Sequence, residues 1–143
     1  MGQQQLLLLV LSTVIVGLAT VAGIQAFSEN QQQATQDALV QRAITLGNDV
    51  LSAHREPNQL GGITLGGDDT SPSDIASAIG VSSASGIAAD GAGESASCDI
   101  SNGEDPTVEC GSGGSTSGAV TVEVDVDPDA EEPVSVGNIT VNS

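Results

Sequence analysis

The sequence predicts an α+β protein in which a long N-terminal helix, apolar in its first half and amphipathic in its second, carries a small and mostly β C-terminal domain. Three observations lead to this fold class. Residues 6–27 contain no charged side chain, and the helical pattern that follows them meets no proline before Pro57. Residues 119–127 alternate valine with threonine, glutamate or aspartate, which is typical of a half-buried strand.

The apolar segment 6–27 follows a short polar leader or tip, residues 1–5, that has no lysine or arginine. Its 22 residues would span about 33 Å as a helix, close to the ~30 Å hydrocarbon thickness of a bilayer. A secretory signal peptide is the alternative, but the segment is long for one and no positive charge precedes it. Length and flanking residues therefore favour a permanent transmembrane helix.

Small residues occur throughout this segment, namely Ser12, Thr13, Gly17, Thr20 and Gly23. They leave room for neighbouring helices to approach closely. The two glycines have a second interpretation, a stretchable helix, because each costs roughly 1 kcal/mol in a helix interior. Close packing is the simpler interpretation.

We expect an amphipathic continuation of the helix over residues 28–56. Its first ten residues are polar, and an apolar stripe follows at spacings of four, three and four residues: Leu39, Ala43, Leu46 and Val50. These spacings put the four side chains on one helix face. That face is expected to hold the C-terminal domain, or a neighbouring helix, against this part of the chain.

Residues 57–143 are expected to form one small, acidic, β-rich domain, which begins where Pro57 and the following glycines end the helix. A short second helix is predicted within it. Ser71 is its expected N-cap, with Pro72 at the first position and Asp74 near the positive end of the helix dipole. Gly80 is expected to stop this helix.

Three glycine-rich segments separate the remaining elements. Residues 61–67 are expected to form a short strand or turn, 81–97 to be weakly structured, and 111–118 to be a flexible connector. The strand predicted over 119–127 has a plausible antiparallel partner in 134–141. The domain lacks aromatic residues, so its core must be thin and needs a disulfide, bound ions or neighbouring copies.

Cys98 and Cys110 are the two cysteines of the chain, and they bracket a polar segment rich in turn-forming residues. In an exported chain they predict a disulfide that closes the loop 98–110, worth roughly 3 kcal/mol on the chain-entropy model. Two free thiols in a cytosolic protein are the alternative. A metal site is disfavoured because no histidine lies nearby to complete the ligands.

The charge is strongly negative and unevenly distributed. The chain has 19 acidic residues, two arginines and no lysine, and residues 61–143 carry 15 of the acids and no basic residue. This balance argues against binding to nucleic acid or to anionic lipid headgroups. The acidic surface is either a low-complexity solvated face or a halophilic adaptation, in which salt screens the self-repulsion. The absence of lysine favours the halophilic interpretation.

No catalytic set is evident, and we expect neither an enzyme nor an essential cofactor. His54 is the single histidine. It lies at the predicted helix end, where histidine usually caps carbonyl groups or is solvated. No Ser/His/Asp arrangement can be built around it with an aromatic pocket, and no phosphate-binding or zinc-binding motif occurs.

Two patterns near the C-terminus are candidate sites. Asp125, Asp127 and Asp129 alternate along the chain and offer oxygen ligands for Ca²⁺. The glycine and closing glutamate of an EF-hand loop are missing, so a solvated acidic edge explains this pattern more simply. Asn138 begins an Asn-Ile-Thr triplet, the acceptor pattern for N-glycosylation.

Residues 2–54 resemble the N-terminal region of the type IV pilin superfamily, which includes pilins and type II secretion pseudopilins. Gly2 stands directly before three glutamines and the run LLLLVLSTVIVGLATVAGIQAF, which an amphipathic segment continues. A peptidase of that family cuts after a glycine in this position, so the resemblance implies cleavage after Gly2. The family's basic leader is absent, and Leu7 stands where the family has a glutamate. The chain is therefore identified with an atypical bacterial branch.

The resemblance implies a pilin-like fold and a structural role in an extracellular, type IV pilus-like filament at the cell surface. The subunit would span the inner, cytoplasmic membrane, meet the pilus assembly machinery and a prepilin peptidase, and join copies of itself in a helical homopolymer. The alternative is a single-pass membrane-anchored surface or periplasmic binding module that does not polymerise. The residues expected to form the polymerisation core are Leu6, Leu7, Leu8, Leu9, Val10, Leu11, Val14, Ile15, Val16, Leu18, Val21, Ile24 and Phe27.

Overall fold

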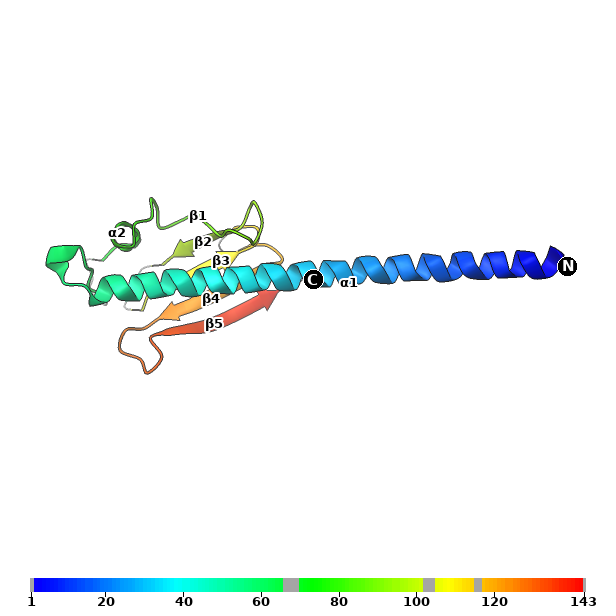
Figure 1. The fold of residues 1–143 in the computed structure, drawn as a ribbon. Coiled ribbons are helices and arrows are strands. Elements are labelled where there is room, and N and C mark those ends of the chain that lie inside the picture. The colour runs from blue at the N-terminus through cyan, green and yellow to red at the C-terminus, as the bar shows by residue number, and fades with distance from the viewer. Residues whose placement is uncertain (1, 66–69, 102–104, 115–116, 143) are drawn as a thin grey trace. The chain divides into compact units, whose positions relative to one another are not determined.

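The computed structural model describes residues 2–65, 70–101, 105–114 and 117–142, and it has the predicted α+β fold (Figure 1). The chain divides into two compact units, Met1–Gln33 and Ala34–Ser143. The elements in chain order are α1 (Gly2–Arg55), the 3₁₀ helix η1 (Asn58–Leu60), α2 (Pro72–Ala78), β1 (Ile87–Ala88), β2 (Ser97–Ile100), β3 (Thr107–Gly111), β4 (Val120–Val126) and β5 (Val134–Val141).

The amphipathic part of α1 supplies one side of the core in the second unit. The predicted stripe is confirmed, because Leu39, Ala43, Leu46 and Val50 are at most 1% exposed. The side chains packed around them come from all five strands, from α2 and from the segments that connect these elements. The helix ends at Arg55, just before Pro57 removes a backbone donor.

The five strands form one antiparallel sheet in the order β1-β2-β3-β4-β5 (Figure 1). Both predicted strands near the C-terminus are confirmed, as β4 and β5. The valines of β4 are 0–2% exposed, whereas the residues between them are half-buried on the opposite face. This alternation follows from the two-residue period of a strand, because one face packs against α1 and the other meets solvent.

Gly47 lies where α1 approaches the sheet most closely among the glycines of this helix. A Cβ atom added there would stand 3.0 Å from Val134 Cγ1, 3.3 Å from Val126 Cγ2 and 3.4 Å from Val124 Cγ1. The missing side chain therefore lets the helix settle directly on the ends of β4 and β5. This close approach compensates for the lack of large aromatic side chains in the core.

The predicted disulfide is present, but its setting differs from the expected loop. Cys98 lies on β2 directly opposite Cys110 on β3, with their Cα atoms 4.0 Å apart. Five of the eleven residues between them belong to these two strands, and residues 102–104 lie outside the described residues. The disulfide therefore joins two neighbouring strands. The polar residues of these strands point outward, and because they are polar the segment resembled a loop in the sequence.

The expectations for the glycine-rich segments were partly wrong. Of the strand or turn expected over residues 61–67, the turn is present at Gly61 and Leu65, and 66–67 lie outside the described residues. Residues 81–97 are not merely weakly structured, because they contain β1 and bury Ala89, Ala92 and Ala96. Small side chains can fill a thin core without any apolar periodicity, so composition alone made this segment look weakly structured. Gly111, assigned to the connector, ends β3.

The short helix α2 has the predicted capping arrangement. Ser71 Oγ accepts a hydrogen bond from the backbone N–H of Asp74, and Asp74 Oδ2 accepts one from the backbone N–H of Ser71 at 3.1 Å. Ser71 Oγ also donates to Asp74 Oδ2 at 2.6 Å. The side-chain and then the backbone hydrogen bond from Ser71 lower the pKa of Asp74 below its ordinary value of 3.8. Gly80, with φ +78°, ends this segment as expected.

A bulky side chain at Gly47 should destabilise the second unit. We expect Gly47→Leu to lower the free energy of unfolding by about 1–3 kcal/mol, because the extra atoms must displace the valines of β4 and β5. Denaturant unfolding of the full chain in detergent measures this loss. Asp49→Leu, on the exposed side of the same turn, is the matched control, and an equal effect of both variants would contradict the assigned close approach.

The capping box should make the stability of α2 depend on acid. A lowered pKa means that ionised Asp74 stabilises the fold above the ordinary value of 3.8, and that this stabilisation is lost as the pH falls through the lower, folded-state value. Asp74→Asn is therefore expected to melt at a lower temperature than the wild type at pH 7, with the difference vanishing in strong acid. The exposed Asp90→Asn should show no such pattern; a difference for Asp74→Asn that does not change with pH would refute the assignment.

Candidate functional site

The first unit exposes a continuous apolar surface. The thirteen side chains expected to form a polymerisation core are all 50–71% exposed in the chain by itself. Among the described residues, α1 is the one helix long and apolar enough to cross a membrane, and a signal sequence near the N-terminus would have the same properties. The surface is thus compatible with membrane insertion, and its burial requires something other than this chain.

The hydroxyl groups within this surface are satisfied by the helix itself. Ser12 Oγ donates to the Leu9 carbonyl at 2.9 Å, Thr13 Oγ1 to the Val10 carbonyl at 2.8 Å, and Thr20 Oγ1 to the Gly17 carbonyl at 2.8 Å. An unpaired hydroxyl in an apolar environment costs on the order of 1–3 kcal/mol. Because these three are already paired, the segment can enter a dry environment without that penalty.

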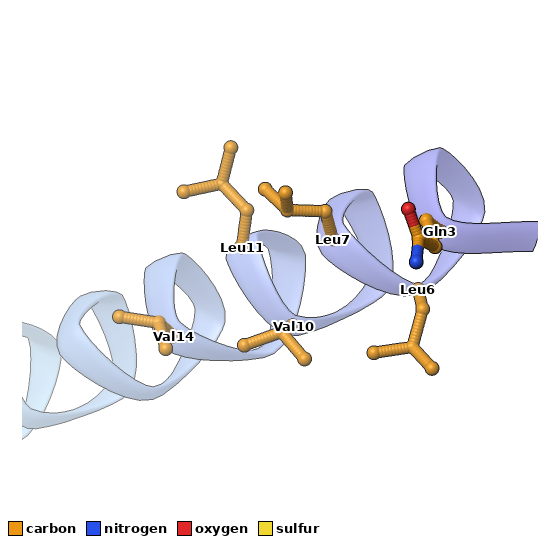
Figure 2. Close-up of a pocket in the computed structure, with 6 residues that line it drawn as sticks. All are labelled: Gln3, Leu6, Leu7, Val10, Leu11 and Val14. Atoms are coloured by element: carbon orange, nitrogen blue, oxygen red, sulfur yellow. The ribbon is translucent and has the colours of Figure 1, made fainter.

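The first four turns of α1 carry a shallow apolar groove. Figure 2 shows Leu7 and Leu11 extending to one side of the helix as viewed and Leu6 and Val10 to the other, so that each pair is four residues apart. Leucines and valines line all but one position, and the Gln3 amide is the polar exception at the N-terminal end. Ridges of a second helix pack into grooves of this kind. The lining residues are Gln3, Leu6, Leu7, Val10, Leu11 and Val14.

The outer face of the sheet in the second unit carries a row of acids that the sequence analysis did not find. Asp99 on β2 stands opposite Glu109 on β3, and Glu109 stands opposite Glu123 on β4. The row ends at Asn138 on β5. The sequence did contain a signal for this pairing, because Asp99 follows Cys98 and Glu109 precedes Cys110. If the two cysteines stand directly opposite each other on antiparallel strands, these two acids must also stand opposite each other.

Like charges directly opposite each other on neighbouring strands are destabilising, since their Cβ atoms lie only about 4.5–5.5 Å apart. The backbone N–H of Gly86 donates to Asp99 Oδ1 at 2.8 Å and so compensates one end of the row. Screening by salt reduces the repulsion among the three carboxylates. The register therefore gives the acidic composition a specific structural consequence, a sheet whose stability should rise with ionic strength.

The calcium candidate does not form a cluster. Asp127 Oδ1 accepts the backbone N–H of Asp129 at 2.9 Å inside the turn after β4. Asp125 instead lies on β4, with its carboxylate directly over Gly137 of β5. In the described ranges, no three His, Cys, Asp or Glu side chains come together as metal ligands. The three carboxylates thus lie in different settings, because Asp125 belongs to β4 whereas Asp127 and Asp129 follow it in the turn around Pro128.

His54 has a different role from the predicted cap or solvated side chain. It is half-buried, and its Nδ1 accepts a hydrogen bond from the backbone N–H of Leu65 at 3.1 Å. The imidazole thereby ties the segment after η1 back to the end of α1, which requires Nδ1 to be unprotonated. The sequence could not predict this contact, because it depends on the chain returning after η1 so that the Leu65 N–H reaches the end of α1.

Two other predicted sites are accessible. Asn138 is exposed, and its register opposite Glu123 places it on the outer face of the sheet. Gly2 is the first residue of α1, and an added Cβ would meet nothing within 4 Å. Glycosylation at Asn138 and cleavage after Gly2 stay predictions.

Comparison of the chain with protein-family models, curated proteins and solved structures found no match in any of the three.

Removing one acid from the row should stabilise the sheet in a salt-dependent manner. We expect Glu109→Gln to raise the free energy of unfolding by about 0.5 kcal/mol at low ionic strength, because two like-charge contacts are lost. In 1 M salt, where the screening length is ~3 Å, the gain should shrink. Denaturant unfolding at the two salt concentrations measures it.

The matched control for this comparison is Glu94→Gln, which removes the same charge from an exposed loop position. It should produce a markedly smaller gain at low salt. The proposed repulsion is wrong if both variants behave alike, or if the gain from Glu109→Gln is insensitive to salt.

Proposed function

We propose that this chain is the structural subunit of a type IV pilus-like filament and that it polymerises through its N-terminal helix. The subunit has no enzymatic role in this proposal. It is held in the cytoplasmic membrane before assembly and reaches the cell surface as part of an extracellular fibre. Its partners are copies of itself, the membrane, the assembly machinery and a prepilin peptidase that cuts after Gly2.

One observation carries this proposal. The 54-residue helix α1 runs without a break from an apolar surface that the chain leaves exposed to a face that forms the core of the acidic unit. Burying a large apolar side chain is worth about 1.5–3 kcal/mol. Thirteen such side chains left in water are a large unfavourable term, so lipid or other copies of the helix must cover them.

The same surface suits both environments that the proposal requires. Lipid tails and neighbouring apolar helices are similarly apolar, so the move from membrane to fibre is close to neutral for each side chain. The internally paired hydroxyls of Ser12, Thr13 and Thr20 need no partner in either place. The groove from Gln3 to Val14 offers a seat for the ridge of a neighbouring helix.

The resemblance of residues 2–54 to type IV pilins supports a fibre over a lone anchor. A lone membrane anchor has no need for an unbroken helix that continues into the domain, since a flexible linker would connect the two as well. The acidic outer face fits the solvent-exposed shell of such a fibre. A high-salt habitat would suit the row formed by Asp99, Glu109 and Glu123, because salt screens their mutual repulsion.

A charge in the apolar segment should prevent polymerisation. We expect Leu9→Asp to abolish fibres, because an ionised carboxylate in a dry helix bundle is very costly. Electron microscopy of fibres sheared from cells, with mass spectrometry of the subunit's N-terminus, measures fibre yield and shows whether the apolar segment is intact.

Leu60→Asp is the matched control, since Leu60 is 76% exposed and lies in η1 rather than in the apolar segment. It should leave fibre yield unchanged. Normal fibres from Leu9→Asp would refute an axial role for the segment. Wild-type protein found only as dispersed monomers in the detergent-extracted membrane would instead identify an anchored module, and a soluble chain lacking the segment would identify a secreted protein.

A further inference from the structure

The strand β5 is an open edge of the sheet. It pairs with β4 over seven registered residue pairs, and no strand of the described chain pairs with its other side. It is eight residues long and is exposed from Val136 onward. The opposite edge, β1, has only two residues. Within the sheet, β5 is thus the one edge long enough to receive a further full-length strand.

This edge has none of the charges that usually protect an exposed strand from pairing. Edge strands commonly carry lysine, other charged residues or proline for that purpose. β5 has the sequence VSVGNITV and contains none of these. The other strands longer than two residues each carry at least one acid, namely Asp99 on β2, Glu109 on β3, and Glu123 and Asp125 on β4.

An uncovered apolar strip accompanies the open edge. Val136, Ile139 and Val141 are 42%, 38% and 47% exposed, although they face the same side of the sheet as the buried valines of β4. Their register partners Val124, Val122 and Val120 are 0–2% exposed. The apolar layer that α1 covers over β4 therefore continues onto β5 without a cover.

We propose that β5 pairs antiparallel with β5 of a second copy of this chain. A second copy offers an edge of the same length and the same lack of charge. About a two-fold axis normal to the sheet, the two strips formed by Val136, Ile139 and Val141 lie on the same side and adjoin. Pairing thus buries apolar surface and satisfies backbone groups at both edges.

Electrostatic repulsion opposes contact between two copies less through β5 than through the acidic outer face of the sheet. When the two β5 strands pair, the β4 strand that carries Glu123 in one copy lies three strand spacings from β4 of the other copy. At ~4.8 Å per spacing, this separation is about 14 Å. This exceeds the ~8 Å screening length at physiological ionic strength. Two copies that met through the outer face would instead bring their acidic rows into direct contact. The neutral β5 strands therefore separate the acidic rows of the two molecules, and the acid that stands over β5 itself is Asp125, whose carboxylate lies above Gly137.

The contact is isologous, so it closes after two copies and cannot by itself propagate a helical polymer. It is distinct from polymerisation through α1 and does not depend on it. In solution, the β5 contact makes a dimer in which the second units of the two copies point in opposite directions. Between fibres it makes lateral contacts.

The test uses the full chain in detergent that covers the apolar segment. Sedimentation velocity over a range of protein concentrations gives the molar mass. We expect the wild type to dimerise, and Thr140→Glu to weaken dimerisation at least about tenfold, because a tenfold loss corresponds to only ~1.4 kcal/mol and the variant places a charge on each edge. Thr140 is exposed on β5, so the variant should keep the fold, as a thermal melt checks.

Thr121→Glu is the matched control, because Thr121 is the register partner of Thr140 one strand further in. The same charge there leaves the edge neutral, and the dimer should persist. A wild type that stays monomeric, or a Thr140→Glu variant that dimerises like the wild type, overturns the proposal. Fibres need not form for this measurement. Conversely, single fibres that no longer associate laterally in Thr140→Glu would leave the proposed polymerisation through α1 intact.

Discussion

The packing of α1 against the valines of β4 is the contact on which the second unit depends. With no aromatic side chain in the core, burial comes from leucine, isoleucine, valine, alanine and the disulfide-bonded cysteines. Such side chains reach only a short distance, so helix and sheet must lie close together. Gly47 permits that approach, and the Cys98–Cys110 bond joins the neighbouring strands β2 and β3. A domain with this thin a core depends on backbone proximity more than on side-chain bulk.

Charge is separated along the chain in a way that matches the proposed contacts. The apolar part of α1 and the strand β5 contain no charged residue, whereas β2, β3 and β4 present acids to solvent. A molecule with a net charge of −17 repels its own copies over most of its surface. Contacts between copies are least opposed at its neutral surfaces. The two surfaces proposed for self-association, the N-terminal helix and the β5 edge, are both neutral.

Local signals allowed much of the fold to be predicted. The spacing from Leu39 to Val50, the Ser71–Asp74 capping box and the alternating valines of β4 each depend on residues within a few positions of one another, and each was confirmed. Prediction failed where the signal was composition without period. The Ser-, Gly- and Ala-rich segment 81–97 looked weakly structured although it contributes β1 and three buried alanines.

The sequence by itself determined where the helices and the last two strands form and which surface of α1 is apolar, because hydrophobic period, caps and proline act within a few residues. It also determined that the first unit cannot bury its own leucines and valines. Only the tertiary structure decided that Asp99, Glu109 and Glu123 stand in one row, that His54 accepts the Leu65 N–H and that β5 is an open edge. These features depend on strand order, register and the return of the chain onto α1. Such relations join positions far apart in sequence, and no local pattern specifies them.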